Sequence, residues 1–224
     1  MARPRSDIQS RIVKAARARF LREGVDGASL RAIAADAGTT IGMVYYYFRS
    51  KDALFLAVVE VPYAKLLDEL TKELDPARPP RDRIRAMYRR VARIASHEAE
   101  VVRLVVREAL VSSARLASIL ARFQRGHIPL VLRAIADGMR DGTIRSDVPP
   151  LLLLPVVAAV GAIPQLVLPQ LTRGNHATLP GAAELADQLL ELLYTGITSA
   201  PKPSSRNRTR RAGARRKLRL ARTK

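Results

Sequence analysis

The sequence contains no cysteine among its 224 residues. Disulfide bonds, thiol catalysis and cysteine-ligated metal sites are therefore excluded, and a reducing cytoplasm is the compartment that fits this composition. Aromatic residues make up only 4% of the chain, although 48% of it is hydrophobic. The core must therefore consist mainly of Ala, Leu, Val and Ile. Together with the scarcity of alternating strand patterns, this favours an all-α fold.

Sequence patterns for catalysis and metal binding are also scarce. The three histidines, His97, His127 and His176, are far apart in the sequence, and none stands at a metal-ligand spacing from a carboxylate. No Ser/His/Asp arrangement, glycine-rich phosphate loop or pair of catalytic carboxylates can be assembled from the sequence. We therefore expect no enzyme, no metal site and no cofactor.

Charge is absent from the stretch between Val148 and Thr172, which is long enough to span a bilayer. Five prolines and Gln165 weigh against a membrane span, because an interior proline removes a helical hydrogen bond. A buried helix at a subunit interface explains the same composition, and we favour it. Residues 1–9 lack an apolar core of signal-peptide length, so we expect a cytoplasmic protein without a membrane partner.

Acidic residues are absent from residues 201–224, which contain 11 Lys or Arg and supply more than half of the net charge of +19. This tail consists largely of Pro, Ser, Thr, Arg and Lys, so we expect it to be disordered when free. A basic tail indicates a polyanionic partner, nucleic acid before membrane. A tail that only keeps the protein soluble is the alternative.

Residues 29–52 have the pattern of two short helices joined by a tight turn. Ser29 is suited to cap the first helix and Thr40 the second, and Gly38 permits the turn between them. Small residues on both helices allow the close crossing that a helix-turn-helix requires. This interpretation places residues 40–47 in a major groove of DNA.

The helix before this motif is expected to begin near Ser6 or Asp7 and to end at Gly24. Apolar residues recur in it at i, i+4 intervals as far as Phe20, and glycine commonly follows a helix C-terminus. Val44 and Phe48, also at i, i+4, should close a small core against this helix.

Three tyrosines, Tyr45, Tyr46 and Tyr47, follow one another in the second short helix. At 100° per residue they cannot all face the same way, so at least one must be exposed. Beside Arg49 and Lys51, an exposed tyrosine is more simply a phosphate contact than a packing residue.

The runs IVKAARARF, SLRAIAADAG and TTIGMVYYYFRSKDAL closely resemble the DNA-binding domain of tetracycline-repressor-like (TetR family) regulators over about residues 8–60. The resemblance implies a homodimeric, all-helical transcriptional regulator, usually a repressor, that a small ligand in the C-terminal domain releases from DNA. It also implies phosphate contacts by Tyr45, Tyr47 and Lys51, and phosphate or base contacts by Ser29 and Arg31. The complete set expected to contact DNA is Ser29, Arg31, Thr39, Thr40, Ile41, Gly42, Met43, Tyr45, Tyr46, Tyr47 and Lys51.

The sequence departs from the family pattern at three positions. Thr39 stands where an aliphatic residue is common, Ile41 where a polar or charged one is, and Met43 where Thr or Ser is usual. Ile41 and Met43 could pack on thymine methyl groups or could lie over sugar edges. The operator sequence therefore cannot be read from these residues.

Six further helices are predicted beyond residue 50, which gives about nine in all. Pro62 should kink the first of them and act as a hinge for the DNA-binding head, and Pro129 should bend a long one. The proline-rich segment 75–80 separates the first two. The expected ranges are 51–74, 81–96, 98–110, 113–141, 151–171 and 182–197.

The expected organisation is a helix-turn-helix domain in residues 1–50, a helical effector-binding and dimerisation domain in 51–200, and the basic tail in 201–224. The resemblance implies that the last two helices, 151–171 and 182–197, form a four-helix bundle with a second copy. It places the effector site between the fifth and eighth helices, where the candidate residues are Tyr88, Arg103, Arg107, Phe123, His127 and Gln165.

Two pairs among these candidates have simpler explanations. Arg103 and Arg107 lie one helical turn apart and could bind an acidic ligand, but a solvated face with Glu100 at i−3 explains them too. Phe123 and His127 share one face and could equally be core residues.

The leading functional hypothesis is a ligand-responsive transcriptional regulator that binds a palindromic operator in double-stranded DNA as a homodimer. A general DNA-binding or architectural protein, driven by its basic tail, is the alternative from another class, and a membrane-associated protein is the third. Operator selectivity at about 0.2 M salt separates the first two, because nonspecific binding depends on phosphate contacts alone.

Overall fold

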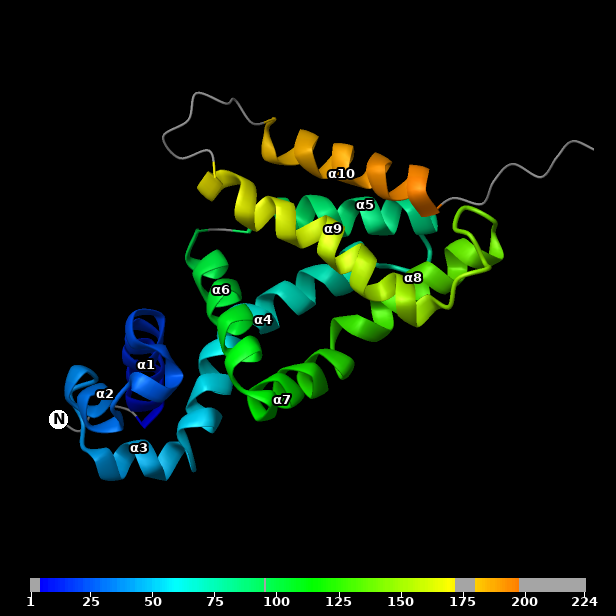
Figure 1. Ribbon diagram of the computed structural model, residues 1–224. Helices are drawn as coiled ribbons and strands as arrows, with labels where there is room; N and C mark the ends of the chain where they lie inside the picture. Colours follow the sequence, from blue (N-terminus) through cyan, green and yellow to red (C-terminus); the bar gives the residue numbers. More distant parts are fainter. Residues whose placement is uncertain (1–4, 95, 172–179, 198–224) are drawn as a thin grey trace, which may run out of the picture.

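The computed structural model describes residues 5–94, 96–171 and 180–197, which form ten α-helices and no strand (Figure 1). The all-α prediction is confirmed. The basic tail 201–224 and His176 lie outside the described residues. The helices are α1 (Arg5–Gly27), α2 (Leu30–Asp36), α3 (Ile41–Tyr47), α4 (Lys51–Glu73), α5 (Pro80–Ala92), α6 (Ser96–Val111), α7 (Ser113–Gln124), α8 (His127–Arg140), α9 (Pro150–Leu171) and α10 (Ala182–Ile197).

Helices α1, α2 and α3 form a small head at the lower left of Figure 1, and α4 leads from it into the body. Val44 and Phe48 are buried with Phe20 and Ile33 in one core, as the sequence predicts. Phe20 meets Phe55 of α4 edge to face, with ring centroids 6.4 Å apart. Each such fully buried side chain contributes roughly 1.5–3 kcal/mol to stability.

The core of the head continues into the body. Val101 and Leu104 of α6 and Ile119 of α7 belong to the same buried cluster as the head residues. The head therefore rests on α6 and α7 as well as on α4, and the limits of the two domains at residues 50 and 200 stay a prediction.

A second core holds the body together. It joins the end of α4 to α5, α8, α9 and α10, and Tyr88 of α5 lies at its centre with no exposed surface. The Tyr88 hydroxyl donates to the Val157 carbonyl oxygen of α9 at 2.8 Å. Of the helices in the described residues, none combines the length and the apolar character needed to cross a membrane.

The prediction of one long helix over residues 113–141, bent at Pro129, is wrong. The chain breaks at Arg125 and Gly126, and α8 then begins at His127. A Cβ atom at residue 126 would lie 2.1 Å from the Tyr63 hydroxyl oxygen, so only glycine allows α4 to approach so closely here. Pro129 falls in the first turn of α8, where the missing N–H has no helical partner to lose.

Helix α4 runs without interruption from Lys51 to Glu73 with Pro62 inside it. Its start is fixed by Ser50, whose hydroxyl oxygen accepts a hydrogen bond from the Ala53 N–H at 3.0 Å. The role of Pro62 as a hinge stays a prediction. Helix α5 ends at Ala92, earlier than the predicted Ser96, because the Arg93 N–H already bonds back to the carbonyls of its last turn.

Candidate nucleic-acid interface

The turn between α2 and α3 is built by local capping bonds. The Ser29 hydroxyl oxygen accepts from the Ala32 N–H at 3.5 Å, and the Thr40 hydroxyl oxygen accepts from the Met43 N–H at 3.3 Å. Gly38 has a φ of 61°, a left-handed conformation that favours glycine. Caps of this kind contribute about 1 kcal/mol each. The predictions for Ser29, Gly38 and Thr40 are therefore confirmed as elements of the fold.

Two arginines of α1 fix the orientation of α2. Arg11 donates to the Ala37 carbonyl oxygen at 2.8 Å. Arg19 donates to both carboxylate oxygens of Asp36 at 2.6 and 3.0 Å, and these hydrogen bonds hold the pKa of Asp36 below its usual value. Helix α2 therefore supports α3 from a fixed position.

The outer face of α2 and α3 presents polar and aromatic side chains to solvent. Tyr45 is 54% exposed and Tyr46 is 69% exposed, so the expectation of at least one exposed tyrosine is confirmed. The residues of the predicted DNA-contacting set that are exposed are Ser29, Arg31, Thr40, Gly42, Tyr45 and Tyr46. Since Val44 and Phe48 already close the core, the core does not need either of the two exposed tyrosines.

The other members of the predicted set are half-buried. Ile41 and Tyr47 pack against the first core, and the Tyr47 ring meets Tyr46 edge to face with centroids 5.1 Å apart. Thr39 and Met43 are also half-buried. Part of the surface of Ile41 and Tyr47 therefore holds α3 in place, which limits what these side chains offer to DNA.

Lys51 lies at the start of α4 and contacts the end of α1. Its Nζ atom donates to the Asp26 carbonyl oxygen at 2.8 Å. Because an ammonium group has three donors, this bond leaves others for a phosphate. Arg49, in the link before α4, is exposed and adds a second cation near Lys51. Its position two residues after Tyr47 is the signal in the sequence that points to it.

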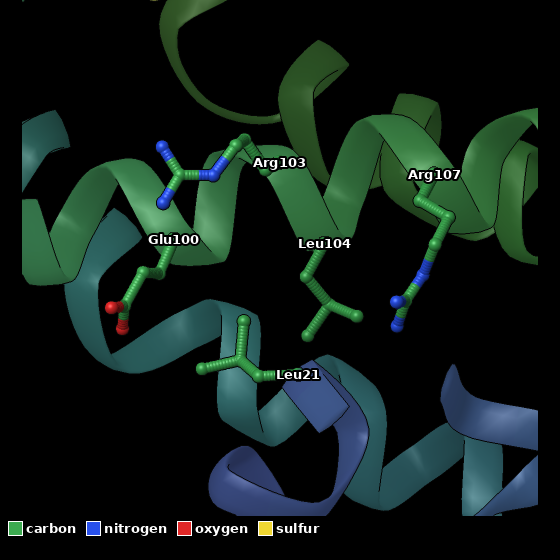
Figure 2. A pocket seen from close by; sticks show the side chains of 5 residues that line it. All are labelled: Leu21, Glu100, Arg103, Leu104 and Arg107. Carbon is green, nitrogen blue, oxygen red and sulfur yellow. The ribbon is translucent and has the colours of Figure 1, made fainter. Parts of the chain in front are cut away.

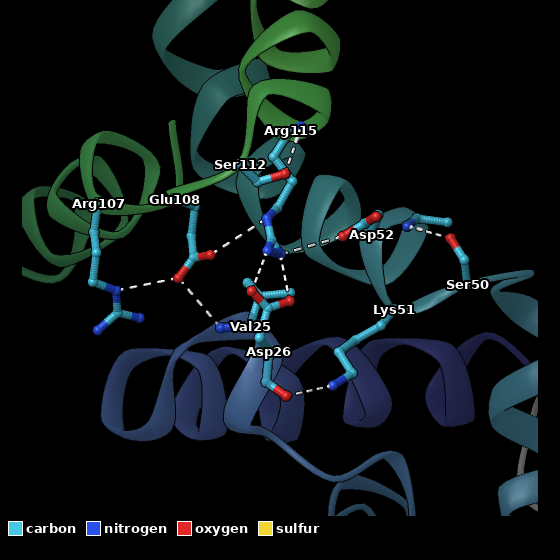
Figure 3. A network of polar contacts seen from close by, with 10 residues as sticks. Val25, Asp26, Ser50, Lys51, Asp52, Arg107, Glu108, Ser112 and Arg115 are labelled. Atoms are coloured by element: carbon cyan, nitrogen blue, oxygen red, sulfur yellow. Dashed lines mark hydrogen bonds and ion pairs between the residues drawn. The ribbon is translucent and has the colours of Figure 1, made fainter. Parts of the chain in front are cut away.

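A polar network connects this head to α6 and α7 (Figure 3). Both guanidinium Nη atoms of Arg115 donate to the Asp26 carboxylate, at 2.9 and 2.6 Å. The Arg115 Nε atom lies 3.4 Å from Glu108, whose carboxylate also accepts from the Val25 N–H at 3.2 Å. We call these four residues, Val25, Asp26, Glu108 and Arg115, the head–body joint.

Two members of the head–body joint are buried charges. Arg115 is 5% exposed and Glu108 is 3% exposed, whereas Asp26 faces solvent. Removing one partner of a buried ion pair leaves the other charge unsolvated, which is strongly destabilising. The joint therefore ties the position of the head to that of α6 and α7.

Known proteins share this architecture and parts of this sequence. Residues 12–58 match the sequence pattern of the bacterial regulatory proteins of the tetR family. The HTH-type transcriptional repressor SCO4008 of Streptomyces coelicolor is 31% identical over 176 residues, which cover 77% of this chain and 85% of that repressor. The chain belongs to the tetR family of bacterial regulatory proteins. It is a DNA-binding transcriptional regulator, so the resemblance seen in the sequence is confirmed.

Solved structures extend the likeness from the head to the fold of most of the chain. FadR from Bacillus subtilis, in complex with stearoyl-CoA, has a TM-score of 0.68 at 16% identity, covering 84% of this chain and 98% of FadR. AibR, in complex with isovaleryl coenzyme A and operator DNA, has a TM-score of 0.63 at 19% identity, with coverages of 84% and 98%. At these identities the shared property is the fold of head and body.

The six residues predicted to line a ligand pocket in this tetR-family chain lie in three places. Tyr88 and Gln165 meet between α5 and α9, where the Gln165 Nε2 atom donates to the Tyr88 carbonyl oxygen at 3.3 Å. Burial raises the pKa of the Tyr88 hydroxyl well above its ordinary value. Arg103 and Arg107 lie on α6 and line a crevice that faces α1.

Phe123 and His127 occupy the third place, at the junction of α7 and α8 with α4. Their ring centroids are 4.9 Å apart, and the Tyr63 hydroxyl lies 2.9 Å from the His127 Nδ1 atom. Burial, with a contribution from the Arg122 charge, lowers the pKa of His127 to about 4. Neutral His127 can therefore accept a hydrogen bond from the Tyr63 hydroxyl, and this bond supports the fold at the junction. Among the described residues, no three His, Cys, Asp or Glu side chains are grouped to hold a metal ion.

Proposed function

We propose that this tetR-family regulator is a repressor that binds a palindromic operator as a homodimer and leaves it when a small ligand binds. The observation that carries the proposal is the exposed face of α3, with Thr40 and Gly42 at its beginning and Tyr45 and Tyr46 beyond them. The N-terminal residues of a recognition helix normally meet base edges in the major groove.

The residues of this face divide between two kinds of contact. Phosphate groups are bound by Ser29, Arg31, Tyr45, Tyr47 and Lys51, which offer hydroxyl and cationic donors. Base edges and sugars are met by Thr39, Thr40, Ile41, Gly42 and Met43, and Tyr46 lies between the two groups. Because phosphate contacts position the protein and base contacts specify the site, selectivity depends on the second group.

Apolar side chains exposed on α9 and α10 support the homodimer. They are Leu151, Leu152, Val156, Ile163, Val167 and Leu192, each between 43% and 69% exposed. An apolar surface of this extent is typical of an interaction site. Pairing α9 and α10 with the same helices of a second copy covers these side chains and places two heads on one face of the DNA, about one helical turn apart.

The names of the relatives support repression and a small-molecule effector. SCO4008 is named a transcriptional repressor, and the FadR and AibR structures contain acyl coenzyme A molecules. The effector binds in the body and regulates DNA binding, and the protein does not convert it chemically. The effector site includes some of the candidate residues Tyr88, Arg103, Arg107, Phe123, His127 and Gln165. Such a regulator acts in the cytoplasm, on the nucleoid when bound to DNA.

Selection of fragments from the source genome tests the proposed function. Wild-type protein should enrich a few fragments that share an inverted repeat, whereas Tyr45→Ala should weaken their binding without changing which fragments are found. Arg125→Ala, which removes an exposed cation of the body, is the control and should behave as the wild type. Uniform recovery of all fragments would instead favour the architectural alternative.

The dimer is tested separately by sedimentation at micromolar concentration. Leu192 is 65% exposed, so Leu192→Glu should leave the protomer folded but place a charge in the apolar interface. We expect the variant to sediment as a monomer and to lose operator binding. A variant that remained dimeric and bound DNA normally would contradict the assignment of α9 and α10.

A further inference from the structure

A crevice of about 380 Å³ lies between α6 and the end of α1, beside the head–body joint (Figure 2). It is lined by Leu21 of α1 and by Glu100, Arg103, Leu104 and Arg107 of α6. Leu21 and Leu104 point toward each other, Glu100 and Arg103 lie toward one end, and Arg107 lies toward the other. The crevice is therefore an apolar slot with a cation near each end.

Glu100, the acidic residue of the crevice, is engaged by an arginine of the head. Its Oε2 atom lies 3.1 Å from the Nη2 atom of Arg17 in α1. Arg103 is exposed and has no ion-pair or hydrogen-bond partner within the described parts of the chain. Because Glu100 pairs with Arg17, it is not available to neutralise Arg103. This weakens the alternative explanation, in which Arg103 and Arg107 form a solvated face balanced by Glu100.

Arg107 is only partly satisfied by the protein. Its Nη2 atom donates to the Phe20 carbonyl oxygen at 2.5 Å, and its Nε atom donates to Glu108 at 3.2 Å. Its Nη1 atom remains for another acceptor. Arg103 and Arg107 lie one turn apart on the same helix face, where like charges destabilise a helix. An anion bound beside Arg103 would reduce that repulsion.

We propose that this crevice binds a small organic anion, with its carboxylate or phosphate group at Arg103 and its apolar part along Leu21 and Leu104, toward Arg107. A guanidinium group presents N–H donors in a geometry that matches two oxygens of such a group. The volume is at the small end of the range for ligand pockets, so it suits a compact acid.

The location of the crevice gives such a ligand a route to the DNA-binding head. Leu21 belongs to the head and Arg103 to the body, so a bound molecule contacts both. Arg107, at the other end of the slot, bonds to the Phe20 carbonyl oxygen and to Glu108 of the head–body joint, so a molecule lying along the slot also contacts a side chain that links head and body. This consequence for DNA binding rests on the proposed function, whereas the binding of the anion does not.

Titration of the full-length protein with octanoate, and with octan-1-ol as the uncharged control, tests the proposal. Methyl NMR should show octanoate shifting the signals of Leu21 and Leu104, while octan-1-ol at the same concentration shifts them far less. Arg103→Gln should raise the dissociation constant for octanoate about tenfold, because it removes the charge-assisted contact to the carboxylate. Arg125→Gln is the matched control and should bind octanoate as the wild type does.

Three results would overturn the anion site. They are wild-type affinity for octanoate in Arg103→Gln, methyl shifts centred away from Leu21 and Leu104, and no octanoate binding to the wild type at about 1 mM. Operator titration in the absence of octanoate tests the proposed function on its own. Failure of one experiment is therefore distinguishable from failure of the other.

Discussion

Exposed side chains without a structural task are the clearest signs of function at the scale of single residues. Arg31 is exposed on α2 and has no partner in the described part of the chain, unlike Arg19, which is held by Asp36. Arg31→Ala should weaken operator binding about tenfold and reduce the slope of log K against log salt by about 0.9, the value for one phosphate contact. Fluorescence anisotropy at several salt concentrations measures both quantities.

The control for Arg31 is a second exposed cation that lies away from the head. Arg125→Ala should change neither the affinity nor the slope. If Arg31→Ala behaved in the same way, its assignment as a DNA contact would be wrong.

The buried His127 predicts how the free energy of unfolding depends on pH in acid. Burial lowers its pKa from 6.5 to about 4, so between these values the unfolded chain binds more protons than the folded one. Its contribution to stability is fully present above pH 6.5 and is lost as the pH falls toward 4, by at most roughly 1.4 kcal/mol per pH unit. The groups that face it are Tyr63, which does not ionise in this window, and Arg122, which stays charged.

Urea unfolding at pH 7 and pH 4.5 checks this prediction. His127→Gln retains an acceptor for the Tyr63 hydroxyl but cannot take up a proton. The wild type should lose on the order of 2 kcal/mol more stability than the variant over this interval. Equal losses in both proteins would show that His127 does not carry the effect.

At the scale of helices, the head–body joint is the contact that sequence reasoning could not find. Arg115→Met removes one of the two cations at the buried Glu108 carboxylate and leaves only Arg107, and we expect a loss of about 3 kcal/mol in the free energy of unfolding. Arg115→Met combined with Glu108→Gln should recover part of the loss, because the amide oxygen can still accept from the Val25 N–H. Chemical denaturation measures both variants.

An exposed ion pair provides the control for the joint. Arg145 pairs with Asp147 at the surface, where solvent screens the pair, so Arg145→Met should cost far less stability than Arg115→Met. Similar losses in Arg145→Met and Arg115→Met would contradict the structural importance of the joint.

What the sequence predicts correctly follows from interactions between near neighbours. Ser29 and Thr40 cap N–H groups three residues ahead, so their roles are visible in the sequence. The break at Gly126 depends on Tyr63, and the joint depends on Asp26 meeting Arg115, residues separated by 89 positions. Such contacts arise only when the helices pack. For the same reason the predicted ligand residues, chosen by helix faces, separate into three places.

At the scale of the whole molecule, the proposed functions lie on different surfaces: DNA binding on the head and dimerisation on an apolar face of the body. The described head presents α3, and α9 and α10 present an uncovered apolar face. The basic tail 201–224 lies outside the described residues, and its contact with DNA stays a prediction. Its 11 cations should add a sequence-independent attraction to phosphate.

Deletion of residues 201–224 tests the role of the tail. If the tail neutralises about five phosphates, the slope of log K against log salt should fall by roughly 4 to 5 while the preference for the operator persists. The measurement is a salt series on operator and random DNA with both proteins. An unchanged slope would show that the tail does not contact DNA.

The central claim is that α3 reads a specific site, and competition binding on a selected genomic fragment tests it most directly. At about 0.2 M salt the full-length protein should prefer this fragment over its scrambled sequence by at least roughly 1,000-fold, with two protomers bound per site. A ratio near one would contradict the claim, because it would mean that phosphate attraction alone accounts for binding.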